Sequence, residues 1–145
     1  MSFAHFSLLG AVIAGRDTGD VSFERAALVE MLATLAVAVR AIGADEVALS
    51  IHDFDGRFAS LIDNAMNDLE ALGVQTMSDP DRTAGVGYYP SVCFKVHATF
   101  GAETIEVGDG GFVPWTQRLL SNAKERLLVG GLGLDRLALL SPPPG

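Results

Sequence analysis

The sequence predicts an α+β fold in which helices flank an antiparallel sheet. A chain of 145 residues is long enough for one hydrophobic core and short for two, so we expect a single domain over residues 1–140 and a tail at 141–145. Hydrophobic residues make up 49% of the chain, which excludes a disordered polypeptide. Two consecutive strand patterns meet at Gly101, an arrangement typical of an antiparallel hairpin.

The N-terminal segment is expected to form a strand over residues 6–14, a Gly-rich turn over 15–20 and a helix over 22–42. Ser22 is a typical capping residue, and Gly43 stands where helices commonly end in a left-handed residue. Apolar and small residues cover most of the circumference of this helix, which indicates burial on more than one side. We therefore expect helix 22–42 to offer an apolar face to a second copy of the chain or to a partner subunit.

A second strand and helix follow. Residues 47–51 alternate apolar with small or polar side chains, which predicts a half-buried strand. Residues 57–72 repeat apolar side chains at helical spacing, which predicts a helix. Asp53 or Asp55 can start this helix, and Gly73 ends it. The apolar stripe of this helix comprises Phe58, Leu61, Ile62, Ala65, Leu69 and Leu72.

The C-terminal half begins with a turn-rich stretch at 77–87 and then a strand at 91–99. In that strand Val92, Phe94, Val96 and Ala98 are expected on one face and Cys93, Lys95, His97 and Thr99 on the other. The remaining expected elements are a strand at 103–107, a sheet-breaking GDGG segment at 108–111, a helix at 114–124, a Gly-interrupted strand at 127–134, and a helix at 136–140 that starts after Asp135.

Charge and cysteine content exclude several classes of protein. The net charge of −8 argues against nucleic-acid or anionic-membrane binding by the chain alone, because phosphate contacts need clustered cations. The longest apolar stretch, residues 26–39, contains Glu30 and is too short to span a bilayer. No Lys or Arg precedes residues 6–14, so the basic region of a signal peptide is missing and we expect a cytoplasmic protein. Its single cysteine, Cys93, is expected to be a reduced and inert thiol.

Few residues point to chemistry on their own. The three histidines are too far apart for metal-ligand spacing on one element, and His52-Asp53 is more typical of a polar strand end than of a metal site. The Gly-rich strand at 130–133, however, leads directly into Asp135 and Arg136 at a helix start. Glycines allow a planar ligand to lie against the backbone, and an arginine there adds a cation beside a helix N-terminus. This combination favours a nucleotide at Gly131, Gly133 and Arg136.

Four segments in the right order carry a resemblance to a known family. Residues 131–137 (GLGLDRL) resemble motif 3 of the class II aminoacyl-tRNA synthetases, and residues 81–94 (DRTAGVGYYPSVCF) are similar to the histidyl-tRNA synthetase segment LVRGLDYYTGxVFE. The pair at 110–111 falls where that family has GGRYD, and residues 6–15 are similar to the strand after motif 2, roughly EFxQxxxExxG. The resemblance covers nearly the whole chain. It implies a partial class II catalytic core that binds ATP with Mg²⁺, with adenine against Gly131 and Gly133 and Arg136 over the ring or the phosphates.

Departures from the family pattern concern the parts that hold substrate. Motif 1, the first half of motif 2 with its α-phosphate arginine, and an anticodon-binding domain are missing, and helix 57–72 stands in place of the large insertion domain. Apolar or small residues replace polar ones at Leu8, Val12, Ala84, Gly87 and Phe112. A remnant of the substrate pocket is expected at Tyr88, Tyr89, Leu8, Val12 and Phe112.

Four functions remain open. The first is a non-catalytic, truncated paralogue that acts as a regulatory or structural subunit, of the kind known for ATP phosphoribosyltransferase. The second is an adenylate-forming ligase for a small amino or carboxylic acid, in which Arg16 is the only nearby substitute for the α-phosphate arginine. The third is a stand-alone domain that oligomerises through its apolar helix, and the fourth is a fragment completed by a partner chain. A cleft filled by Leu8, Val12 and Phe112 would favour the first.

Overall fold

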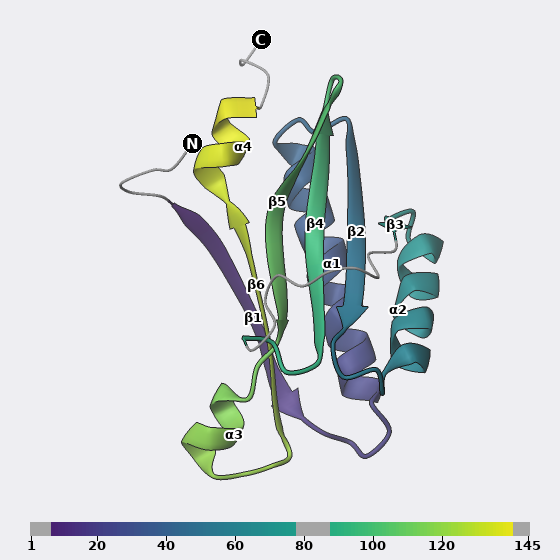
Figure 1. Cartoon of the computed structure of the whole chain (residues 1–145), viewed down its shortest axis with the longest axis vertical. Coiled ribbons are helices and arrows are strands. Elements are labelled where there is room, and N and C mark those ends of the chain that lie inside the picture. Colours follow the sequence, from purple (N-terminus) through teal and green to yellow (C-terminus); the bar gives the residue numbers. More distant parts are fainter. Residues whose placement is uncertain (1–6, 78–87, 141–145) are drawn as a thin grey trace.

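The predicted α+β class is confirmed by a computed structural model that describes residues 7–77 and 88–140. The strands are β1 (Leu8–Arg16), β2 (Glu46–Asp53), β3 (Gln75–Met77), β4 (Val92–Phe100), β5 (Glu103–Phe112) and β6 (Glu125–Gly133). The helices are α1 (Ser22–Ala41), α2 (Ala59–Ala71), α3 (Trp115–Leu120) and α4 (Leu134–Leu140). The strands form one six-stranded sheet in the order β1-β6-β5-β4-β2-β3 (Figure 1). Neighbouring strands are antiparallel except for β2 and β3, which are parallel.

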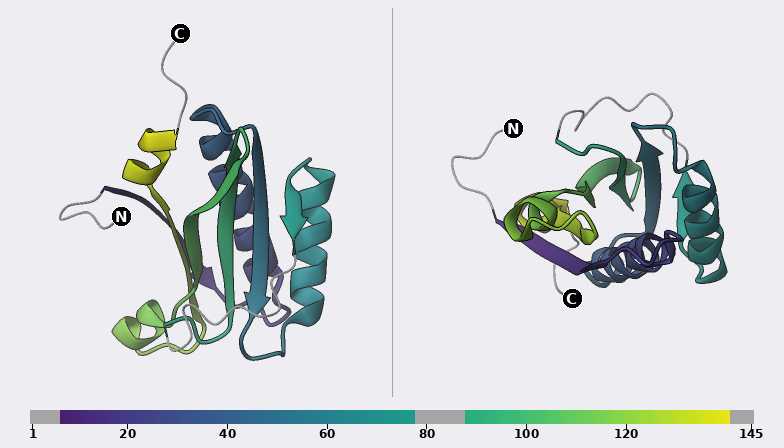
Figure 2. Two further views of the ribbon diagram at one scale, coloured as in Figure 1. Left: turned by 45° about the horizontal axis from the view of Figure 1, so that its top comes forward. Right: turned by 90° about the horizontal axis from the view of Figure 1, so that it is seen from below.

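One face of the sheet is covered by α1, with α2 packed beside it (Figure 2). The core lies between α1 and the strands, where Leu28, Leu32 and Leu35 of the helix meet Phe94 and Leu128 of the sheet. Burial follows the predicted alternation in β4: Val92, Phe94, Val96 and Ala98 are all buried on the α1 side. Cys93 points to the other face but is also fully buried, so the thiol is more enclosed than the sequence suggests.

The GDGG segment does not break the sheet, contrary to the prediction. Residues 108–111 continue β5 and pair with both β4 and β6. The three strands approach so closely here that a Cβ at Gly110 would lie 2.2 Å from the Val129 carbonyl oxygen and 2.4 Å from Phe94 Cζ. Glycine is therefore used for close backbone approach in the middle of the sheet rather than for a turn.

The start of α1 also differs from the prediction. Ser22 is the first helical residue rather than the cap, and the N-cap position is Val21, which has a left-handed φ of 57° and makes no side-chain cap bond. Asp20 supplies the missing acceptor: its Oδ1 accepts hydrogen bonds from the Ser22 backbone N–H and from the Thr18 hydroxyl. Hydrogen bonds from Ser22 and Thr18 lower the pKa of Asp20 to about 2, because they stabilise the charged carboxylate.

Other differences concern the ends of elements. β1 continues through Arg16, so the turn that was expected from residue 15 begins later. Asp53 holds the chain that enters α2, because its Oδ2 accepts a hydrogen bond of 2.7 Å from the Phe58 backbone N–H. Leu72 was expected on the buried stripe of this helix but lies past its end and is 61% exposed.

The short strand β3 was not predicted, and α3 ends at Leu120 instead of residue 124. The tail at 141–145 and most of the turn-rich stretch, residues 78–87, lie outside the described residues.

Candidate functional site

The face of the sheet opposite α1, here called the open face, carries most of the residues predicted to form a site. The register places Leu8 and Val12 of β1, Gly131 and Gly133 of β6, and Asp109 of β5 on this face. A Cβ added at Gly10, on the same face of β1, would meet no atom within 4 Å, so the described residues leave this edge of the sheet uncovered. In Figure 1 the open face looks toward the viewer, with α4 at its upper end and α3 at its lower end.

A depression of about 220 Å³ at the upper end of the open face is called the upper depression. Its lining includes Leu8, Gly131, Gly133 and Arg136, so the structure brings together the residues predicted to hold a nucleotide. Arg136 belongs to α4, and its Nη1 donates a hydrogen bond of 2.8 Å to the Glu106 carbonyl oxygen in β5. The guanidinium group thereby ties α4 to the sheet at the rim of the depression.

Side chains of both charges lie at the upper depression. Glu106 and Asp109 both line it, and Arg136 is the one cation among its described lining residues. Lys95, from β4, lies nearby with its Nζ 3.6 Å from Glu106 Oε2, and Tyr89 Oη lies 3.5 Å from Asp109 Oδ2. A polyanionic triphosphate placed here would face two carboxylates, which repel its charge, although one of them is paired with Lys95. The residues present suit the flat part of a nucleotide but do not fit its phosphates.

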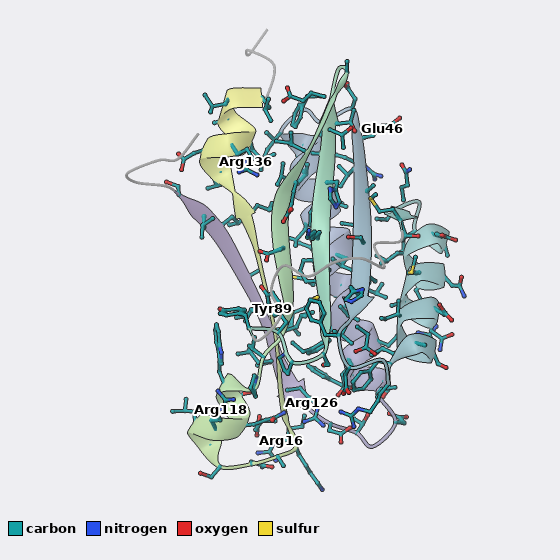
Figure 3. All side chains as sticks on the ribbon, in the orientation of Figure 1. Arg16, Glu46, Tyr89, Arg118, Arg126 and Arg136 are labelled. Atoms are coloured by element: carbon teal, nitrogen blue, oxygen red, sulfur yellow. The ribbon has the colours of Figure 1, made fainter. Side chains whose placement is uncertain are left out.

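Arg16 cannot act together with Arg136 to hold the phosphates of one nucleotide. It ends β1, where its Nε donates a hydrogen bond of 2.9 Å to Glu125 Oε1. Leu8, beside Arg136, and Arg16 are eight residues apart on one straight strand, a separation of roughly 26 Å at the usual rise per residue. Figure 3 shows Arg136 and Arg16 at opposite ends of the β1–β6 pair. The two side chains therefore cannot grip the same small ligand.

The predicted pocket remnant is spread over three places. Leu8 and Val12 are 62% and 67% exposed, so they do not fill a cleft. Tyr88 is also largely exposed and stands edge-on to both Tyr89 and the Trp115 ring. Tyr89 is buried against Gly111, in a small cluster with Cys93 and Val113. Ala84 and Gly87 lie outside the described residues.

Phe112, the last member of the predicted remnant, lines a different cavity of about 330 Å³ at the lower end of the sheet. This basal cavity lies where α1 and α2 begin and where β5 leads into α3. Its polar lining residues include Asp17, Glu24 and Arg126, none of which was predicted from the sequence as a site residue. The sequence does contain one indication of this polar cluster. Glu24 lies four residues before Leu28, on the stripe of α1 that is otherwise apolar.

Metal and membrane sites are not seen in the described part of the chain. No three His, Cys, Asp or Glu side chains in residues 7–77 and 88–140 come together as a metal site. His52 stacks edge-on against Phe54, while the Asp53 carboxylate accepts backbone hydrogen bonds, so this pair is engaged at the strand end. No helix in these ranges has the length and apolarity needed to cross a bilayer.

Comparisons with known proteins find relatives by structure only. No protein-family model matches the chain, and curated proteins give no significant sequence match. The apo histidyl-tRNA synthetase of S. aureus superposes with a TM-score of 0.71 at 18% identity, over 93% of this chain and 39% of that one. A protein from Bacillus halodurans C described as an ATP phosphoribosyltransferase regulatory subunit/histidyl-tRNA synthetase superposes with a TM-score of 0.67 at 16% identity, over 97% of this chain and 54% of that one.

These comparisons confirm the predicted resemblance at the level of fold. The described elements form the sheet and helices that both solved structures share with this chain. The chain spans about two fifths to one half of the length of those proteins. What they share is thus a core fold.

Proposed function

We propose that this chain is a non-catalytic domain built on the histidyl-tRNA synthetase fold, and that it acts as a regulatory or structural subunit. The observation that carries the proposal is the charge pattern of the upper depression, where two carboxylates, Glu106 and Asp109, share the described lining with one cation, Arg136, while the nearby Lys95 is paired with Glu106. An enzyme that activates a carboxylic acid with ATP must stabilise negative charge that develops at phosphate, which requires cations or backbone donors aimed at it. Among the described lining residues Arg136 is the one cation, and it donates to the Glu106 carbonyl oxygen.

The contact made by Arg136 supports the same proposal. Its hydrogen bond to the Glu106 carbonyl oxygen gives the side chain a structural role at the junction of α4 and β5. Arg16, the other candidate cation on β1, is paired with Glu125 at the far end of the strand. No second arginine is among the described lining residues of the upper depression, so the paired arginines that an adenylate-forming ligase would need to hold ATP with Mg²⁺ are not found there.

Pyrophosphate exchange is the direct test of this proposal. The full chain, incubated with ATP, Mg²⁺ and labelled pyrophosphate, is expected to give no label in ATP with histidine or with a panel of other amino and small carboxylic acids. Titration calorimetry with ATP is expected to show no binding at millimolar concentrations, because repulsion by Glu106 and Asp109 opposes the phosphates.

Two arginine variants give this negative result a control. If exchange does occur, and Arg136→Ala abolishes it while Arg118→Ala on α3 leaves it intact, the chain is an adenylate-forming ligase and the proposal is wrong. Arg118 is a matched control because it is an exposed arginine outside both cavities.

A subunit role needs a surface for association, and the outer edge of β1 provides one. Among the described strands β1 pairs with β6 alone, over nine consecutive residues without a bulge, and it carries no charge from Leu8 to Gly15. The opposite edge of the sheet, β3, has only three residues. Natural sheets protect long edges with charges, prolines or bulges, and a long apolar edge without them pairs readily with another strand.

The partner we propose for this edge is β1 of a second copy, in antiparallel orientation about Val12. In that arrangement the Arg16 end of each strand lies beside the Leu8 end of the other. Arg16 has a side chain that is 70% exposed, and the Leu8 end carries Asp135, which accepts a hydrogen bond from the Ser7 backbone. The apolar surface of the strand therefore complements itself, as a twofold interface requires.

Two matched lysine variants distinguish this edge from the predicted interface on helix 22–42. Val12→Lys is expected to convert the dimer into a monomer in light scattering after gel filtration, because it places an ammonium group at the centre of the apolar edge. Val37→Lys, on the exposed side of α1, is expected to leave the dimer unchanged; Val12 and Val37 have nearly equal exposure, 67% and 64%. The reverse pattern would assign the interface to α1, and a wild-type monomer at high concentration would contradict both.

A further inference from the structure

We propose that the basal cavity is a binding site for a small organic cation, in which an ammonium group is attached to an apolar body. The cavity lies at the lower end of the sheet, where α1 and α2 begin, and shares no lining residue with the upper depression. This inference does not depend on the proposed function, since none of its residues belongs to the upper depression or to the edge of β1.

The walls of the basal cavity suit an apolar body. Phe58 and Leu61 enter from the start of α2, Phe112 from the end of β5, and Leu127 from β6. Its volume of about 330 Å³ lies at the lower end of the range for small-molecule sites, roughly 300–1,000 Å³. Such sites combine apolar walls with a few fixed polar groups, and here the polar groups gather beside α1.

Glu24 is the polar group in the basal cavity whose hydrogen bonding is incomplete. Its side chain is only 8% exposed, and Arg126 Nε donates a hydrogen bond of 2.9 Å to Oε1. The second oxygen, Oε2, is shielded from solvent and has no hydrogen-bond partner in the described part of the chain. A buried carboxylate oxygen without a donor is costly, because it has lost water and gained nothing in exchange. Because Glu24 lines the cavity, a donor held there and drawn against its carboxylate would supply the missing hydrogen bond.

The charge balance of the lining selects a cation. Arg126 is opposed by two carboxylates, Glu24 and Asp17, with its Nη2 3.3 Å from Asp17 Oδ2. Its Nη1 donates to the Ala123 and Glu125 carbonyl oxygens, so the guanidinium is already engaged by acceptors on several sides. The three charged groups sum to one excess negative charge. An anionic ligand would compete with Glu24 and Asp17 for Arg126, whereas a monocation would neutralise the site.

Geometry then orients the ligand. In the proposed complex the ammonium group lies toward Glu24 and Asp17, and the apolar body contacts Phe58 and Phe112. An arylalkyl ammonium, with a ring two carbons from the nitrogen, has the required shape and charge. A molecule of the same shape with a hydroxyl or a carboxylate group in place of the ammonium lacks the positive charge that the lining selects.

Three probes of one shape test this selection on the unmodified full chain. Phenethylammonium, 2-phenylethanol and 3-phenylpropionate are each titrated while methyl resonances of Leu61, Val92 and Leu127 are followed by NMR. We expect phenethylammonium to shift these methyl groups and to bind at least about tenfold more tightly than the alcohol, the margin typical of a hydrogen bond to a charged group. The carboxylate is expected not to bind. Equal binding of all three probes, or shifts confined to other residues, would overturn the proposal.

A pair of glutamine variants assigns the effect to Glu24. Glu24→Gln keeps the size and an acceptor for Arg126 but removes the charge, and it is expected to abolish the preference for phenethylammonium over 2-phenylethanol. Glu30→Gln makes the same change on the exposed side of α1, outside the basal cavity, and is expected to preserve that preference. Circular dichroism tests whether each variant is folded. A folded Glu24→Gln protein that still prefers the cation would show that another group selects it and would overturn the role of Glu24. If Glu24→Gln does not fold, the comparison of the three probes on the unmodified chain decides the proposal.

Discussion

Replacing Gly110 with alanine is expected to lower the free energy of unfolding by about 3 kcal/mol or more, the upper range of overpacking effects. The added Cβ would lie 2.2 Å from the Val129 carbonyl oxygen, 2.4 Å from Phe94 Cζ and 2.7 Å from the Gly130 Cα. Two of these three atoms are backbone, and Phe94 is fully buried in the core, so none moves aside without displacing a strand. Urea denaturation followed by far-ultraviolet circular dichroism measures the change.

Gly10 provides the matched control for this substitution. It also lies within a strand, but a Cβ there would meet no atom within 4 Å. Gly10→Ala is therefore expected to be neutral or to stabilise the chain by up to about 1 kcal/mol, because alanine restricts the unfolded state more than glycine does. If Gly10→Ala and Gly110→Ala have similar effects, close approach of the strands is not the reason for glycine in the sheet.

Replacing Arg126 with alanine is the second change with a large expected effect, a loss of about 3–5 kcal/mol of stability. Arg126 joins the N-terminal end of α1 to β6 through Glu24 and reaches Asp17 in the connection before the helix. Its removal would leave the Glu24 carboxylate buried without a cation, which is the costly outcome for a buried ion pair. Thermal and urea denaturation both report this loss.

Two further variants identify its cause. Glu24→Gln combined with Arg126→Ala is expected to recover part of the stability, because no unpaired charge then remains buried. Arg25→Ala removes an exposed arginine from the same turn of α1 and breaks its bidentate pair with Asp68. That change is expected to leave the unfolding midpoint nearly unmoved, since exposed ion pairs contribute little. A double variant no more stable than Arg126→Ala alone would attribute the loss to packing of the arginine stem.

Periodicity predicted much of the fold because it reports directly on burial. The alternation in β4 and the helical stripe from Leu28 to Val39 each correspond to a buried face. Glycine was the main source of error, since it serves both turns and close strand contacts. The positive φ of Gly43 and Gly73 confirms the first use, whereas Gly110 belongs to the second, which only its neighbours in space reveal.

The candidate site was predictable where it depends on one continuous segment and not where it depends on tertiary contacts. Gly131, Gly133 and Arg136 come together because they are neighbours on β6 and α4. Leu8 and Phe112 were expected in one pocket, but the first lines the upper depression and the second lines the basal cavity. The partner of Glu24 is Arg126, about a hundred residues away, and no local pattern links the two side chains.

The unequal edges of the sheet limit how far association can proceed. If two copies pair through β1, each uses its only long free edge among the described strands, and the combined sheet then ends on both sides at β3, with three residues. Such short ends give a third copy little backbone to join. Growth would stop at a closed pair instead of continuing into a fibre, as expected for an interface that uses the same surface on both partners. The short length of β3, a strand that was not predicted from the sequence, would thus limit the assembly to two copies.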